Sequence, residues 1–526
     1  MKTTGRLYTL SLFLRKNILA VLIVMVALIG MLLADDYGMS WDEGVQRELN
    51  GGVVYNYVFN NNSTNYYQGS EKYHGAWLEF LEYAIEKTVN ITDARDIFLF
   101  RHRFNFLLFC LGAWWFASAC KKLFKEEWLA FLGLAVYFLS PRLFADAFYN
   151  SKDIPLFVFY MGVIKVMADY RDAPVVKTII KAGILTGLLI GLRITGIVAV
   201  PAVIGFLFLF LISGQLKATK IVGHSLLFLV STMLSVYACW PILWIKPFYH
   251  FHLAFVEMSY FPLIDSARYM NRFVYTNELP WHYVPVWIGI TTPLTYILLS
   301  LVAAVYLVKE LLLHFRSTIA KKAEWLTIFA MWFFPVLAVI IGQSILYDGW
   351  RHLFFIYAPM LFFIVKGFEL LGNEIRRNQY PKWIMPAFTL LVIAHVAATM
   401  LWLHPYQNLY FNRLAGKDLA EIRPRYETDY WGLSFREAMH NLAVADTSDV
   451  IYYYPATPPV TLSLELLPAS ERKRFMRREL NDLQTGEYFI GNYRYTPGWY
   501  EVPFKLTRVS GVQLGATDIC TVFRKE

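Results

Sequence analysis

The chain has 526 residues, of which 57% are apolar, 17% are aromatic and only 17% are charged. Soluble domains carry roughly 25% charged residues, and the mean hydropathy here is +0.40, so the composition excludes an ordinary water-soluble protein. The net charge is +9, but Lys and Arg lie between apolar segments rather than on one polar face, which argues against nucleic acid as a partner.

Apolar runs predict about eleven membrane spans. A helix needs about 20 mostly apolar residues to cross the hydrocarbon core of a bilayer. This rule places spans at residues 17–34, 97–119, 128–140, 154–170, 179–193, 196–213, 220–243, 285–308, 324–342, 353–371 and 383–403. Only Ile194 and Thr195 separate the runs at 179–193 and 196–213, so these two runs are also compatible with one broken element.

Basic residues between the runs predict the orientation of the chain, because Lys and Arg collect in cytoplasmic loops. Arg6, Arg15 and Lys16 precede the first run, which is not followed by a signal-peptide cleavage site and is therefore retained. Every later loop that this orientation places inside is also basic. These loops contain Lys121, Lys122 and Lys125; Arg171, Lys177 and Lys181; Lys217 and Lys220; Lys309, Arg316, Lys321 and Lys322; and Arg376, Arg377 and Lys382. The N-terminus is predicted to be cytoplasmic and the C-terminus to lie outside.

The long connecting segments all fall on the outer side, at residues 35–96, 140–153, 244–284 and 343–352. Residues 73–89 have helical apolar spacing with charges between, which predicts an amphipathic helix at the membrane interface. Residues 404–526 carry more charge, Pro-rich turns and alternating stretches such as 450–454. We therefore expect a transmembrane module over residues 1–403 and a small mixed α/β extracytoplasmic domain over residues 404–526.

Charged residues at the membrane edge cost free energy and by default mark function. The first such cluster contains Asp42 and Glu43, a short distance after the first span. Adjacent carboxylates can act as a general base or hold a divalent metal. Ordinary solvated acidic residues of an outer loop are the alternative interpretation.

The second cluster, Ser140–Pro155, contains Arg142, Asp146, Lys152 and Asp153 between two prolines. Two carboxylates and two cations within a dozen residues make an unusual interfacial turn, for which a salt-bridged structural turn is the alternative.

The third cluster is Tyr347–His352. A guanidinium (Arg351) and an imidazole (His352) beside an aromatic side chain suit a lipid phosphate, although an arginine snorkelling at the aromatic belt is equally compatible. Arg193, between two apolar runs near the outer face, has no evident anchoring role.

This order of features resembles the C-type membrane glycosyltransferases. It is most similar to the protein O-mannosyltransferase and aminoarabinose-transferase group with its bacterial relatives. The resemblance covers residues 17–405 as an architecture, and its landmarks are the Asp42–Glu43 pair, Ser140–Pro155 and Tyr347–His352. The segments His404–Asn412 and Asp429–Gly432 also match.

The resemblance implies an integral protein of the bacterial inner membrane that moves a sugar from a polyprenyl-phosphate donor to a lipid, glycan or protein acceptor on the outer face, with inversion. Asp42 would be the catalytic carboxylate, Glu43 its neighbour in the acceptor site, and Asp146 or Asp153 the second-loop carboxylate. The donor phosphate would be bound by Arg351, His352, Arg193, Arg142 and Lys152, and the acceptor would contact Tyr149, Asn150 and Trp350.

No nucleotide or redox cofactor is implied, because the donor already carries its leaving group. A divalent metal is compatible with the paired carboxylates, and metal dependence differs across the superfamily. Residues 404–526 match no insertion of the family, so substrate specificity does not transfer.

Two other function classes remain open. A transporter or flippase of a lipid-linked or small polar substrate usually has paired repeats and ionisable residues near the bilayer midplane. Here the charges cluster at the outer edge and no repeat is visible, which favours an enzyme. A glycan ligase or polymerase is the nearer alternative and differs in acceptor size. A non-catalytic scaffold would leave the second charged cluster unexplained.

Overall fold

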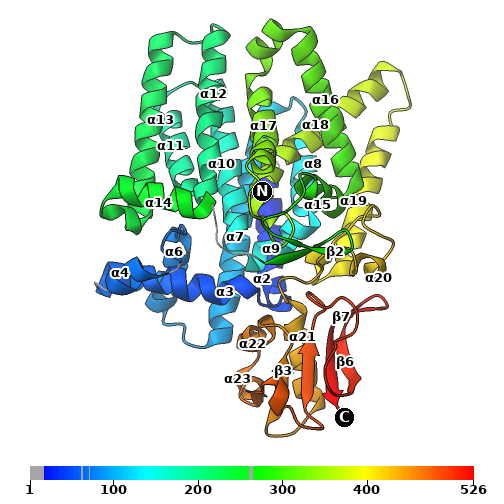
Figure 1. Cartoon of the computed structure of the whole chain (residues 1–526). Helices are drawn as coiled ribbons and strands as arrows, with labels where there is room; N and C mark the ends of the chain where they lie inside the picture. The colour runs from blue at the N-terminus through cyan, green and yellow to red at the C-terminus, as the bar shows by residue number, and fades with distance from the viewer. Residues whose placement is uncertain (1–16, 61–62, 70, 260–264) are drawn as a thin grey trace, which may run out of the picture.

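The computed structural model describes residues 17–60, 63–69, 71–259 and 265–526. Arg6, Arg15 and Lys16 therefore lie outside the described residues. Figure 1 shows a bundle of long helices with a small sheet-containing unit at one end, formed by the C-terminal part of the chain.

Helices lie at all eleven predicted span positions. They are α2 (Ile18–Leu33), α7 (Ala94–Leu123), α8 (Glu127–Phe138), α10 (Asp153–Asp172), α11 (Val176–Ile190), α12 (Ala199–Ile212), α13 (Ala218–Cys239), α16 (Leu294–Leu313), α17 (Phe315–Ile341), α18 (Tyr357–Arg377) and α19 (Ile384–Leu403).

Within the described residues, eight helices are long and apolar enough to cross a membrane by themselves. The pair α8 and α9 (Pro141–Tyr149) makes a ninth candidate, bent by 62°. Of the remaining two, α11 has 15 residues, and α10 carries five charged residues along its 20. Four of these charges (Lys165, Asp169, Arg171 and Asp172) lie toward the C-terminal end of α10 at less buried positions, where they form ion pairs with one another, with Lys122 and with Glu324.

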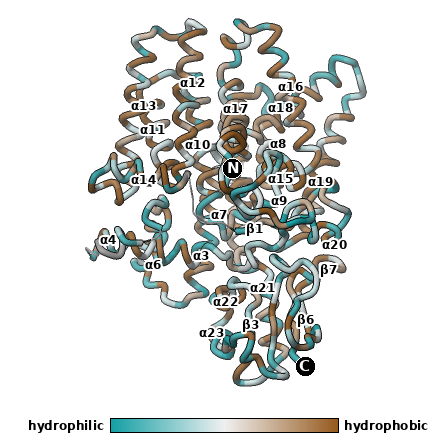
Figure 2. Tube along the Cα trace, viewed as in Figure 1, coloured by the Kyte–Doolittle hydropathy of each residue, from teal (hydrophilic) through white to brown (hydrophobic). Residues whose placement is uncertain are grey.

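The outer surface of the bundle is apolar. Figure 2 shows hydrophobic residues along the helices and hydrophilic residues in the connections at both ends. On α13, for example, Leu226, Val230 and Met233 are exposed. Such a surface is stable in hydrocarbon and not in water, so the chain is an integral membrane protein.

The segment between the first two spans is mainly helical. It contains α3 (Trp41–Val45), a wider turn at Gln46–Gly52, α4 (Val53–Asn60), α5 (Ser63–Gln68) and α6 (Trp77–Val89). The predicted amphipathic helix is confirmed as α6, but its most buried face carries Glu79, Glu82 and Glu86. These carboxylates surround Arg101 of α7, at 2.5, 2.9 and 2.5 Å respectively. Charge pairing as well as apolar packing therefore positions α6.

The loop predicted at residues 244–284 contains α14 (Pro247–Ser259) and an antiparallel hairpin of β1 (Ser266–Tyr269) and β2 (Arg272–Tyr275). Helix α15 (Tyr283–Thr291) follows and leads into α16. Tyr269 at the end of β1 forms a β-bridge with Tyr426, so this loop is joined to the C-terminal part of the chain.

The C-terminal part is a mixed α/β unit, as predicted. Its five-stranded sheet has the order β4-β3-β5-β7-β6, with β3 parallel to β4 and β5 and with β7 antiparallel to β5 and β6. The strands are β3 (Ile451–Pro455), β4 (Phe475–Arg477), β5 (Tyr488–Gly491), β6 (Leu506–Leu514) and β7 (Thr517–Lys525). The helices are α20 (Leu419–Ile422), α21 (Ser434–Ala445), α22 (Pro459–Ser463) and α23 (Ala469–Arg472). Helix α21 packs on β6 and β7.

Helices α11 and α13 approach closely because glycines of α11 face serines of α13. A Cβ atom added at Gly187 would lie 2.4 Å from Cβ of Ser235 and 2.7 Å from the backbone oxygen of Thr232. Small residues at such contacts let membrane helices pack closely.

We therefore expect Gly187→Ala to lower the free energy of unfolding by about 1–3 kcal/mol, because the added methyl group overpacks the contact. The matched control is Gly223→Ala on α13, where an added Cβ meets nothing within 4 Å. That change should be neutral or stabilise by up to about 1 kcal/mol through helix propensity. Thermal unfolding of both variants in detergent checks the prediction, and equal melting temperatures would contradict it.

Candidate functional site

A buried network of ion pairs lies where the outer segments meet, and Arg351 is at its centre. The side chain of Arg351 is 2% exposed. Its Nη1 atom is 2.9 Å from Oδ2 of Asp42 and 3.5 Å from Oδ2 of Asp153, and its Nη2 atom is 3.1 Å from Oδ2 of Asp348. Carboxylates from three distant parts of the chain thus surround one guanidinium group.

Arg193 extends this network on the transmembrane side. It is an extended residue (φ −150°, ψ 136°) between α11 and the short 3₁₀-helix Ile194–Val198, where the sequence predicted a break. Its Nη1 atom lies 3.1 Å from Oδ1 of Asp153. The carboxylate of Asp153, which is 1% exposed, is therefore shared by two arginines.

Local backbone geometry gives Asp42 and Glu43 different environments although they are adjacent. The backbone N–H of Ser40 donates to Oε2 of Glu43 at 2.6 Å, which closes a capping box at the start of α3. The other Glu43 oxygen is 2.8 Å from Nε2 of His102 on α7. Glu43 thus points into the protein and contacts His102, whereas the side chain of Asp42 is 25% exposed and contacts Arg351.

Asn150 positions Asp153 at the start of α10. Its side-chain oxygen accepts from the backbone N–H of Asp153 at 2.9 Å, and its side-chain nitrogen donates to Oδ2 of Asp153 at 3.2 Å. The same nitrogen lies 3.3 Å from Oδ1 of Asp146. Asn150, predicted as an acceptor contact, therefore lies between the two carboxylates of this turn and bonds to both.

The C-terminal part of the chain contributes a third arginine. Arg494 Nη2 lies 2.6 Å from Oδ1 of Asp348, and its Nε atom is 3.9 Å from Glu427. The indole of Trp431 covers the guanidinium of Arg351, whose Cζ atom lies 4.5 Å from the centroid of the Trp431 ring. Residues 427–431 and 494 are therefore part of the network that holds Arg351.

Burial changes the proton affinity of the carboxyl groups around Arg494. Burial raises the pKa of Asp348, and the charges of Arg494 and Arg351 oppose this shift. Burial raises the pKa of Glu427 to about 8, again opposed by Arg494. The carboxyl group of Glu427 is therefore neutral at mildly acidic and neutral pH.

Lys152 is a buried cation next to the network. It is 7% exposed, and its side chain forms no ion pair with any of the described residues. Burial and the charge of Arg193 lower the pKa of Lys152 to about 8. Burial and the charge of Lys152 also lower the pKa of nearby His74 to about 4. The imidazole of His74 is therefore uncharged at neutral pH, and Lys152 and Arg193 are the cations on this side of the network.

Four other predicted site residues pack beside or beneath the network. Asp146 is fully buried and accepts a hydrogen bond from Nε1 of Trp431 at 3.0 Å. Tyr149 is also buried and contacts the ring of Trp431. Arg142 donates to the backbone oxygen of Tyr410 at 3.1 Å, and Trp350 donates to Oγ1 of Thr291 at 2.9 Å. The contacts of Asp146 and Tyr149 fix the surroundings of Trp431.

Sequence reasoning selected Asp42, Asp153, Arg193, Lys152 and Arg351, which the structure brings together. It did not select Asp348, Glu427, Trp431 or Arg494. Asp348 and Trp431 lie within segments that the sequence singled out, at Tyr347–His352 and Asp429–Gly432. Arg494 follows β5 in an irregular segment and carries no signal of its own.

The described residues include no group of three or more His, Cys, Asp or Glu side chains arranged to hold a metal ion. The three carboxylates of the network face guanidinium groups instead. These residues do not fit a divalent cation.

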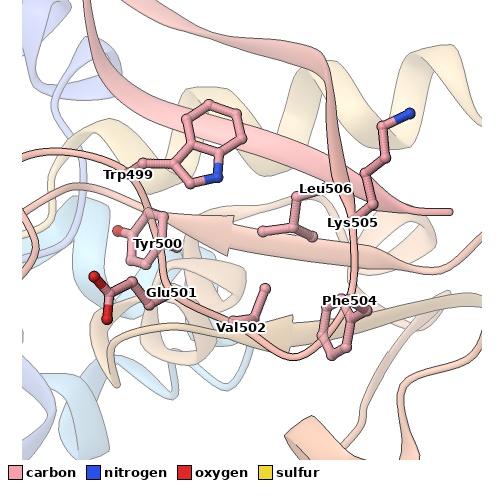
Figure 3. A pocket seen from close by; sticks show the side chains of 7 residues that line it. All are labelled: Trp499, Tyr500, Glu501, Val502, Phe504, Lys505 and Leu506. Atoms are coloured by element: carbon pink, nitrogen blue, oxygen red, sulfur yellow. The ribbon is translucent and has the colours of Figure 1, made fainter.

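A cavity of about 590 Å³ lies against the C-terminal sheet and is lined by one segment, Trp499–Leu506. Figure 3 shows that its side chains include Glu501 and Lys505 among aromatic and aliphatic groups. It contains none of the predicted site residues.

No family model and no curated protein matches the chain. Among solved structures, the oligosaccharyltransferase AglB from Archaeoglobus fulgidus, in complex with an inhibitory peptide and a dolichol-phosphate, is similar with a TM-score of 0.52 and 10% identity. The match covers 88% of this chain and 64% of AglB, so this chain spans less than two thirds of that protein. The apo form of the same enzyme gives a TM-score of 0.51.

ArnT from Cupriavidus metallidurans, bound to undecaprenyl phosphate, is similar over 96% of this chain and 98% of its own, with a TM-score of 0.48 and 11% identity. The resemblance seen in the sequence is confirmed at the level of the fold, because the AglB match spans most of the chain. This chain has the fold of the C-type membrane glycosyltransferases.

The pKa of Glu427 leads to a prediction about stability. Below pH 4.5, which is the ordinary pKa of a Glu side chain, the carboxyl group is protonated in both the folded and the unfolded chain. Between pH 4.5 and about 8 it ionises only in the unfolded chain. The free energy of unfolding should therefore fall as pH rises through this window. Glu427→Gln should remove that part of the pH dependence, and Glu501→Gln, at an exposed position, should retain it. Thermal unfolding in detergent across the window is the measurement, and an unchanged profile for Glu427→Gln would contradict the assignment.

Proposed function

We propose that this protein transfers a sugar from a polyprenyl-phosphate-linked donor to a hydroxyl of a lipid, glycan or protein acceptor, with inversion, on the extracytoplasmic face of the bacterial inner membrane. The fold supports this class of reaction, and the AglB structure with the same fold contains a dolichol-phosphate. The observation that carries the proposal is the exposure of Asp42. Its side chain is 25% exposed, whereas those of Asp153 and Asp348 are 1% and 5% exposed.

Asp42 acts as the general base. Its carboxylate is held at 2.9 Å from Nη1 of Arg351, which orients it while part of it remains accessible. It takes the proton of the acceptor hydroxyl as the oxygen forms a bond to the anomeric carbon. On the opposite face of the sugar, the bond from that carbon to the phosphate oxygen breaks, and its electron pair leaves with the polyprenyl phosphate.

Lys152, with Arg193 and His352 beside it, binds the donor phosphate. Three guanidinium groups (Arg351, Arg193 and Arg494) match three carboxylates (Asp42, Asp153 and Asp348) in the observed ion pairs. Lys152 remains without an ion pair among the described residues, so its charge is available to neutralise the phosphate as it leaves. Both Nη atoms of Arg351 already face carboxylates, which supports a positioning role for Arg351 rather than the direct phosphate contact expected from the sequence.

The arrangement of the helices supports the proposed orientation. Figure 1 shows the α12–α13 and α16–α17 connections at the end of the bundle opposite the C-terminal sheet. Lys217 lies in the first of these connections, Lys220 lies at the start of α13, and Arg316, Lys321 and Lys322 lie near the start of α17. Basic residues at the ends of spans favour the cytoplasmic side, which supports an outer location for the C-terminal unit and the Arg351 network.

The first experiment is a transfer assay with purified protein in detergent, a panel of polyprenyl-phosphate sugars and a membrane extract as the source of acceptors. We expect Asp42→Asn to lower the rate of donor consumption by about 100-fold or more, because an amide keeps the shape of the side chain and loses the base. Asp96→Asn, at an exposed position, is the control and should keep full activity.

Full activity of Asp42→Asn would overturn the assignment of the base. If the wild type consumed no donor, direct binding of the same polyprenyl-phosphate sugars would decide. Specific binding without consumption would point to a missing acceptor, and absence of binding would favour the transporter alternative.

Donor dependence separates the roles of Lys152 and Arg351. Lys152→Gln should raise the KM for the lipid donor by roughly 10- to 100-fold, since it removes a charge-assisted contact to the phosphate. Arg351→Gln should mainly lower kcat, because Asp42 loses its orienting partner. Steady-state kinetics with varied donor measure both effects, and Lys87→Gln at an exposed position of α6 is the control. A larger KM effect in Arg351→Gln than in Lys152→Gln would contradict this division.

A further inference from the structure

A second charged cavity lies where candidate membrane spans end, and none of the site residues line it. This cavity, here called the junction groove, has a volume of about 540 Å³. It is lined by Asp35 and Asp36 after α2, Arg95 at the start of α7, His404 and Pro405 after α19, Arg436 and Glu437 on α21, and Leu466–Pro468.

The carboxylates that line the junction groove already have partners. Asp35 pairs with Arg103 at 2.5 Å, and Asp36 lies 3.0 Å from Nε2 of His404. Glu437 accepts a hydrogen bond from the hydroxyl of Tyr406 at 2.5 Å. The acidic side of the groove is therefore satisfied by the protein itself.

The two arginines of the groove differ from its carboxylates, because they lack ion-pair partners among the described residues. Neither Arg95 nor Arg436 forms an ion pair with any of the described residues, and the side chain of Arg436 donates only to the backbone oxygen of Tyr37, at 3.3 Å. Burial and then the charge of Arg95 lower the pKa of Arg436, and the charges of Asp35 and Asp36 oppose this shift. Two like charges thus lie close together in one cavity, an arrangement that an anion between them would stabilise.

The position of the groove along the helices indicates where such an anion comes from. Three candidate membrane spans have an end at the groove, namely Ile18–Asp36, Ala94–Leu123 and Ile384–Leu403. The ends of membrane spans lie at the level of the lipid headgroups. About one turn deeper on two of these spans, Leu32, Leu401 and Trp402 are highly exposed, and they provide an apolar surface for acyl chains near the ends of the spans.

We propose that the junction groove binds the phosphate group of an anionic glycerophospholipid, with Arg95 and Arg436 as its ligands and the acyl chains along α2 and α19. Guanidinium groups match phosphate oxygens in pairs of parallel hydrogen bonds. This inference does not depend on the transfer reaction proposed above.

The test uses the purified full-length protein in detergent and native mass spectrometry to count bound lipid. Phosphatidylglycerol should half-saturate one site at about tenfold lower concentration than phosphatidylcholine, a difference of about 1.4 kcal/mol. The Arg95→Gln/Arg436→Gln double variant should lose this preference. The control Arg316→Gln/Arg377→Gln removes the same charge from exposed positions elsewhere and should keep it.

The single variant Arg95→Gln is the control for misfolding, because the side chain of Arg95 makes no ion pair within the described part of the chain. It should weaken phosphatidylglycerol binding by several-fold without a change in melting temperature. Retention of the preference in the double variant, or equal loss in the control, would overturn the proposal. Displacement of the lipid by inorganic phosphate at equal concentration would also overturn it, since the site would then recognise free phosphate rather than a lipid.

Discussion

The structure around the site depends on one constraint, the need to neutralise the buried guanidinium group of Arg351. Its side chain is 2% exposed, and it contacts Asp42, Asp153 and Asp348. An unpaired buried charge costs several kcal/mol, and removal of one partner from such a network typically destabilises a protein by about 3–5 kcal/mol. The segments that supply these partners are therefore held together, whatever their distance in the sequence.

This constraint explains why the C-terminal unit belongs to the site. Three carboxylates around one arginine leave excess negative charge, which Arg193 offsets on the transmembrane side and Arg494 on the side of the C-terminal sheet. Trp431 covers the guanidinium of Arg351 and at the same time donates to Asp146. Among the described residues, Asp42 is left as the accessible carboxylate of the network and Lys152 as a cation without an ion pair, and the proposed reaction uses both.

The sequence alone determined the membrane class, the positions of the spans and several of the charged residues that matter. An apolar run long enough to cross a bilayer is a local property, so helices lie at all eleven predicted positions. The local sequence also indicates Asp42, Asp153, Arg193 and Arg351 as site residues, because a charge at a membrane edge costs free energy and by default marks function. The alternation of residues 450–454 likewise predicted strand β3, with Ile451 and Tyr453 buried and the residues between them less so.

Only the tertiary structure decided which of these charges meet and what each one contacts. Asp42 and Arg351 are 309 residues apart, and Asp348 and Arg494 are 146 apart. No local pattern encodes such pairs, since they arise from the packing of α3, α10 and the 3₁₀-helix Arg351–Ile356 with the C-terminal unit. Asp42 and Glu43 are neighbours of the same chemical type, yet the capping box turns Glu43 toward His102 and leaves Asp42 at the network. The roles of the residues follow from these directions in space, which a sequence of residue types does not contain.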